Sequence, residues 1–229
     1  MRELLIGLSI AAAALAADIP RLANGKPDFN GVWQRPYVPD MSRSGKNQQG
    51  PGTLPFTPRG AEIFKNYDVS KFDYTGHCLP AGLTRSMNSP FPIEIVQTPV
   101  RVAILYEAWN LFHVIPTDGR SPSKDPDPTW MGSSVGSWDG DTLVIDTVGF
   151  NDKTNLDTAG HPHSDQLHVI ERLTRTDATH VAYEITISDP KVYSEPWKNN
   201  RVFTLRPDWE IMEYSCEENN KDLQEGHIK

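Results

Sequence analysis

The chain has 229 residues, with 22 basic and 30 acidic side chains and a formal net charge of −8. Hydrophobic residues make up 38% of it, enough to build a core, which excludes wholesale disorder. The acidic balance argues against nucleic acid or an anionic membrane as the main partner, and the length fits a single domain.

The N-terminal segment has the features of a secretory signal peptide. Residues 4–17 are apolar and rich in alanine, Arg2 precedes them, and Ala14-Leu15-Ala16 forms a small-x-small cleavage signal. We therefore expect a signal peptide at 1–17 and a secreted or periplasmic domain over 18–229. A membrane anchor is the alternative, but spanning a bilayer takes ~20 apolar residues, so we expect no membrane insertion. The lack of an Asn-x-Ser/Thr glycosylation site favours a bacterial exported protein.

The first expected strand, residues 31–34, contains the sequence Gly31-Val32-Trp33. This Gly-x-Trp resembles the signature of the lipocalin or calycin superfamily. The resemblance implies an up-and-down β-barrel in which the tryptophan closes one end and the interior holds a small apolar ligand. A broader likeness to exported bacterial proteins of unassigned function implies no activity; it runs through residues 87–90, 127–132, 146–152, 160–165 and 216–220.

Residues 35–60 contain five prolines and four glycines, which is too irregular for a strand. We expect an extended cover or a mobile loop there within the same domain. At its end, Thr57 and Pro58 are typical of a helix N-terminus, so a short helix is predicted over 58–66.

From residue 93 onward the pattern is one of strands joined by tight turns, of which Asp139-Gly140 is the strongest hairpin signal. The predicted strands are 93–98, 101–107, 109–115, 133–138, 142–148, 167–175, 180–188, 201–206 and 210–216. With residues 31–34 these make an all-β chain. Successive hairpins favour an antiparallel up-and-down barrel of about 8–10 strands, because closure protects the sheet edges. A two-sheet β-sandwich is the alternative.

Cys78 and Cys216 are the chain's only cysteines, and neither has a metal-binding spacing. An oxidising compartment would let them form a disulfide. The alternative is two buried free thiols.

The densest group of reactive side chains lies at His161, His163, Asp165, His168 and Glu171. The three histidines could hold a divalent metal, and His-x-His resembles part of a cupin motif, although the glycine framing and the second histidine strand are missing. The same group could instead perform acid–base catalysis without any cofactor. In that scheme Asp165 orients an imidazole.

Alternation in residues 167–175 places Glu171 among three aliphatic side chains, which predicts an inward carboxyl with a raised pKa. The alternative is a core ion pair with Arg101 or Arg201. His113, Tyr106 and Tyr183 also fall on apolar faces; His113 could support Glu171 or be a core residue, and the tyrosines could contact substrate.

Two long loops, residues 116–131 and 149–166, are expected to surround the open end of the barrel. Trp130 and Met131 would give them an apolar ligand-binding surface, and Asn151 would provide a polar side chain that could contact the ligand.

These observations predict a secreted enzyme with non-redox acid–base chemistry, an elimination, isomerisation or hydrolysis, on a small and partly apolar molecule. Glu171, His161, His163, Asp165 and His113 are its expected catalytic residues. The alternatives are a non-catalytic small-molecule carrier of lipocalin type and a structural envelope protein whose partners bind segment 35–60.

Overall fold

The computed structural model describes residues 19–68, 73–218, 220–221 and 225–226, so the predicted signal peptide lies outside the described residues. The described residues form one sheet of nine strands in the order β4-β3-β2-β1-β9-β8-β7-β6-β5, and every hydrogen-bonded neighbour is antiparallel. The strands are β1 Gly31–Gln34, β2 Ile93–Thr98, β3 Arg101–Tyr106, β4 Leu111–Pro116, β5 Ser133–Asp139, β6 Thr142–Val148, β7 His168–Arg175, β8 His180–Ser188 and β9 Trp197–Leu205. The helical segments are α1 Pro58–Asn66, η1 Tyr74–His77, α3 Leu83–Asn88 and η2 Ala108–Asn110.

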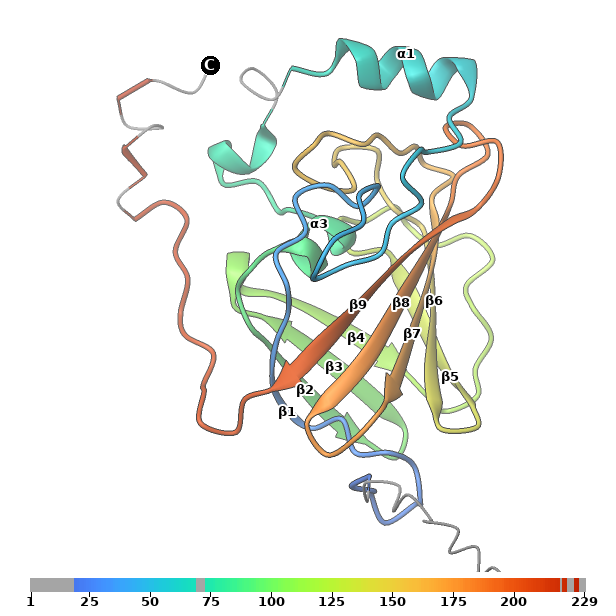
Figure 1. The fold of residues 1–229 in the computed structure, drawn as a ribbon, viewed down its shortest axis with the longest axis vertical. Helices are drawn as coiled ribbons and strands as arrows, with labels where there is room; N and C mark the ends of the chain where they lie inside the picture. Colours follow the sequence, from blue (N-terminus) through green and yellow to red (C-terminus); the bar gives the residue numbers. More distant parts are fainter. Residues whose placement is uncertain (1–18, 69–72, 219, 222–224, 227–229) are drawn as a thin grey trace, which may run out of the picture.

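The sheet rolls into a nearly closed up-and-down barrel (Figure 1). Strand β1 pairs with β2 on one side and with β9 on the other, where Trp33 lies opposite Leu205 and Gln34 opposite Thr204. The predicted all-β barrel is thereby confirmed, and the sandwich alternative is not observed.

Strands β4 and β5 meet at the one seam that has no backbone ladder between the described strands. Eight antiparallel pairings among nine strands leave β4 and β5 running in the same direction, so loop 117–132 must return along the barrel. Side chains close the seam instead: His113 Nε2 lies 2.5 Å from Ser134 Oγ. Gly136 allows the strands to approach, because a Cβ there would lie 2.9 Å from a methyl of Ile115.

The barrel interior is the hydrophobic core, because alternate residues of each strand point inward. Trp33 is fully buried near the end that carries the short turns, where its indole donates to Phe29 O at 2.8 Å and lies under the Arg175 guanidinium. This agrees with the end-closing tryptophan that the Gly-x-Trp resemblance implies.

The opposite end carries the long connections and the helices (Figure 1). Helix α1 has the predicted bounds and N-cap, with Thr57 Oγ1 accepting from Gly60 N. Segment 35–57 crosses this end without forming a strand and pairs locally with β9 and with the loop before it, through Gln49–Asn200 and Phe56–Tyr193. Helix α3, not predicted from the sequence, is buried along its whole length and plugs the barrel mouth.

The C-terminal segment differs from the sequence prediction. Residues 210–216 form no strand; β9 starts at Trp197 rather than 201 and is the last strand of the described chain. After β9 the chain instead runs along the outside of the barrel (Figure 1), where the predicted Cys78–Cys216 disulfide is present. None of the helices in the described part of the chain combines the length and apolar character needed to cross a bilayer.

Candidate functional site

Glu171 lies on β7 in the barrel interior and is fully buried, as its alternation pattern predicts. Tyr183 of the neighbouring strand β8 donates its hydroxyl to Glu171 Oε1 at 2.8 Å. Burial raises the Glu171 pKa to about 7, although the Tyr183 hydrogen bond and the charges of Arg201 and Arg35 oppose this rise. The carboxyl can therefore hold a proton near neutral pH.

Two buried arginines whose charges act on this carboxyl bind α3. Arg35, directly after β1, donates to Ser86 O at 2.8 Å, and Arg201 of β9 donates to Met87 O at 3.3 Å and to Asn88 Oδ1 at 2.6 Å. Both guanidiniums thus bind the C-terminal end of α3, where helix carbonyls lack partners. Burial lowers each arginine pKa to about 10, so both side chains remain charged at neutral pH.

Several polar atoms of this interior cluster lack a hydrogen-bond partner among the described residues. They are Glu171 Oε2, Tyr106 Oη, Arg35 Nε and Arg201 Nη2. Buried polar atoms are normally satisfied by protein, water or ligand, so this group is chemically competent to bind a polar molecule. The cluster contains three of the predicted site residues, Glu171, Tyr106 and Tyr183. It also contains Arg201, one of the two arginines that the sequence offered as an ion-pair partner of Glu171.

The histidines of the predicted catalytic cluster lie elsewhere, in the loop at the helical end. His161 Nδ1 lies 2.7 Å from Asp157 Oδ2, and its ring stacks on Phe64 with centroids 4.6 Å apart. His163 is buried and bonds Thr154 Oγ1 at 2.6 Å through Nε2. The carboxylate that orients His161 is therefore Asp157.

Asp165 and His168 lie outside the barrel. Asp165 pairs with Lys191 at 2.5 Å and has a side chain that is 55% exposed. His168 bonds Asp146 at 2.9 Å on the outer face of β7 and β6. Since each of His161, His163 and His168 has its own partner, the predicted metal triad is not assembled in this arrangement.

One other group of metal-ligating side chains is close together within the described residues: Asp40, Asp157 and His161. Both Asp157 oxygens accept hydrogen bonds, from Met41 N and from His161, and Asp40 accepts from Ser42 and Arg43. These hydrogen bonds are enough to hold the two carboxylates in place, and we propose no metal site on them.

His113 belongs to the β4–β5 seam. Besides its contact with Ser134, whose hydroxyl lies 2.7 Å from Thr147 Oγ1, it has a buried Nδ1 with no partner among the described residues. Burial lowers the His113 pKa to about 4, so the imidazole is neutral at neutral pH. A base this weak, with no carboxylate on Nδ1, is poorly suited to activate Ser134 as a nucleophile.

A groove of about 930 Å³ runs along this seam, between β4, the start of β5 and loop 117–132. Its lining includes His113 together with Trp130 and Met131, the residues predicted to provide apolar binding surface. Phe112 and Val114 of β4 also line it and are 66% and 42% exposed.

Asn151 does not line the seam groove. Its backbone amide donates to Thr129 O at 2.8 Å and its side chain accepts from Lys153 N at 3.2 Å, so it shapes its own loop.

Sequence reasoning missed Arg35 and Ser134. Continuing the alternation past Trp33 would have placed Arg35 inside the barrel, and the same alternation back from Gly136 would have placed Ser134 there.

Comparison with known proteins gives little further information. No family model and no curated protein matches the chain. Among solved structures, the chain is similar to an abundant heat soluble (SAHS) protein of Ramazzottius varieornatus, with 8% identity, 78% of this chain and 95% of that chain covered, and a TM-score of 0.36. At this TM-score no statement about the function of the chain follows from the likeness.

Proposed function

We propose that the chain is a small-molecule-binding barrel whose ligand lies in the seam groove. The observation that carries the proposal is the groove itself, because about 930 Å³ lies within the range of ~300–1,000 Å³ typical of small-molecule sites. Trp130, Met131, Phe112 and Val114 give it apolar and aromatic walls. An apolar lining of this kind selects a ligand with an apolar body.

The polar component of recognition comes from His113. Its imidazole is neutral, and its buried Nδ1 has no hydrogen-bond partner among the described residues. A neutral imidazole binds an uncharged polar group without the desolvation cost of an ion. We therefore infer a partly apolar ligand that carries a hydrogen-bonding group.

Acid–base catalysis at Glu171 is the second candidate function, favoured by the raised pKa and the free Oε2 atom. Substrate would have to reach a fully buried carboxyl, and no imidazole among the described residues is hydrogen-bonded to it. Apolar contact in the seam groove needs no such opening, because Phe112 and Val114 are already exposed there, and we therefore prefer it. If a substrate is found, Glu171→Gln must abolish its turnover while leaving binding in the groove unchanged.

The test is a fluorescence titration with 1-anilinonaphthalene-8-sulfonate (ANS), which reports apolar sites by its emission. We expect saturable binding of one ANS per chain. Met131→Glu introduces a charge at a partly buried position of the groove and should weaken binding by about tenfold or more. The matched control is Met212→Glu, because Met212 is 71% exposed on the C-terminal segment outside the groove. Equal affinities of both variants and the wild type would overturn the proposal.

A further inference from the structure

A second, smaller cavity lies at the helical end of the barrel, between α3 and the turn that joins β3 to β4. It has a volume of about 210 Å³ and is lined by Arg85 and Asn88 of α3, by Phe91, by Trp109 and by Tyr37. Its lining shares no residue with the seam groove, and Glu171 does not line it. Tyr37, Phe91 and Trp109 give it three aromatic wall residues.

Two buried donors at this cavity have no hydrogen-bond partner among the described residues: Arg85 Nη1 and Trp109 Nε1. Arg85 is only 5% exposed. Its other terminal nitrogen, Nη2, is fixed by Asp73 Oδ2 at 2.9 Å and by Thr75 Oγ1 at 3.0 Å. The ion pair thus holds the guanidinium in place and leaves Nη1 to a further acceptor.

The turn that carries Trp109 is strained. Trp109 and Asn110 both have positive φ, +61° and +48°, which a large side chain such as tryptophan rarely adopts. Such conformations persist only where surrounding contacts enforce them, and they cluster at functional sites. Trp109 of this turn lines the cavity.

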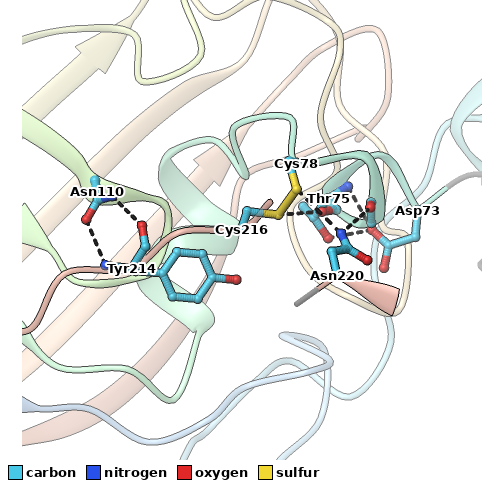
Figure 2. The surroundings of a disulfide bond; sticks show 8 residues. Asp73, Thr75, Cys78, Asn110, Tyr214, Cys216 and Asn220 are labelled. Carbon is cyan, nitrogen blue, oxygen red and sulfur yellow. Dashed lines mark hydrogen bonds between the residues drawn. A yellow bond between two sulfur atoms is a disulfide. The ribbon is translucent and has the colours of Figure 1, made fainter. Parts of the chain in front are cut away.

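The C-terminal segment supplies the contacts that enforce this turn (Figure 2). Asn110 exchanges two hydrogen bonds with the Tyr214 backbone, and the Tyr214 ring packs on Phe91 and Trp109. Two residues further on, Cys216 is bonded to Cys78, next to the η1 segment that carries Thr75. The disulfide therefore fastens the segment that shapes one side of the cavity.

From this geometry we propose that the cavity binds a compact organic carboxylate with an apolar body. The carboxylate accepts from Arg85 Nη1 and Trp109 Nε1, and its apolar body lies between the aromatic walls. A guanidinium favours a carboxylate over a neutral acceptor because the hydrogen bond is charge-assisted. The volume of 210 Å³ limits the ligand to a molecule much smaller than one that fills the seam groove.

The experiment is a calorimetric and tryptophan-fluorescence titration of the oxidised protein with benzoate, and with benzamide as its neutral analogue of equal shape. We expect saturable 1:1 binding of benzoate and at least tenfold weaker binding of benzamide. Arg85→Gln should weaken benzoate about tenfold or more, and Trp109→Phe, which keeps a ring but removes the donor, roughly fivefold. The matched controls are Arg43→Gln and Trp209→Phe, at exposed positions outside the cavity, which should bind within about twofold of wild type.

Three results would overturn the inference: no saturable benzoate binding, equal affinities for benzoate and benzamide, or unchanged affinity in folded Trp109→Phe. The benzamide comparison uses the wild-type chain, so it decides the matter even if Arg85→Gln fails to fold. Benzoate should leave bound ANS in place. Competition between them would put benzoate in the seam groove, contradict the second site and leave the proposed function standing.

Discussion

Replacing Glu171 with glutamine should remove a pH dependence of stability that this one carboxyl creates. The Glu171 pKa is about 7 in the folded chain and 4.5 as its ordinary value. Below pH 4.5 both states hold the proton, whereas between pH 4.5 and 7 only the folded state does. The unfolded chain then binds fewer protons, so stability falls as the pH rises. At 1.36 kcal/mol per pH unit, the loss across this window is about 3 kcal/mol.

Urea denaturation at a series of pH values measures the effect. The wild type should lose about 3 kcal/mol between pH 4.5 and 7 relative to Glu171→Gln, which keeps an acceptor for Tyr183. The difference between the two proteins isolates Glu171, because His113 and His163, whose pKa values are lowered by burial, change stability in both. Glu184→Gln is the matched control, since Glu184 lies on the neighbouring strand β8, where it faces outward and pairs with Lys198. Parallel curves for wild type and Glu171→Gln would refute the reasoning.

Two further predictions concern the links that close the structure. Reducing the Cys78–Cys216 disulfide, which spans 138 residues, should lower the free energy of unfolding by about 5 kcal/mol on the loop-entropy model. Denaturation with and without dithiothreitol measures this loss, and an unchanged midpoint would contradict it. Ser134→Ala leaves His113 Nε2 without its partner and should cost about 1–3 kcal/mol in the same assay. Ser137→Ala, on the outer face of the same strand, should cost less than about 0.5 kcal/mol.

The barrel was predictable because its strands carry a strong local signal. Interior positions alternate in β7 and β8, so Glu171 and Tyr183 could be placed inside from the sequence alone, and the Thr57-Pro58 signal gave the bounds of α1. Segment 210–216 shows where alternation misleads. Two long-range contacts, the disulfide and the hydrogen bond to Asn110, hold this segment outside the sheet.

Only part of the candidate site could be predicted, because proximity in sequence does not determine which side chains converge. His161, His163 and Glu171 are close along the chain, yet the loop histidines bond Asp157 and Thr154 while Glu171 bonds Tyr183 across the barrel. Whether any of them acts in catalysis stays a prediction.

The position of the seam groove could not be predicted from the sequence, because it depends on the relative directions of β4 and β5. Loop 117–132 borders the seam because β4 and β5 run in the same direction. Their common direction follows from the number of antiparallel pairings around the sheet, which the sequence does not show. The sequence predicted Trp130 and Met131 as ligand-binding residues but placed them at the barrel mouth, whereas they line the groove along its side.

The central claim, that a small molecule binds along the β4–β5 seam, is tested most directly by a crystal structure of the chain grown with ANS. We predict electron density for the naphthalene rings beneath loop 117–132, in contact with Trp130 and Met131 and close to His113. Density for the bound ring system inside the barrel beside Glu171, or at another surface with the seam left empty, would contradict the account.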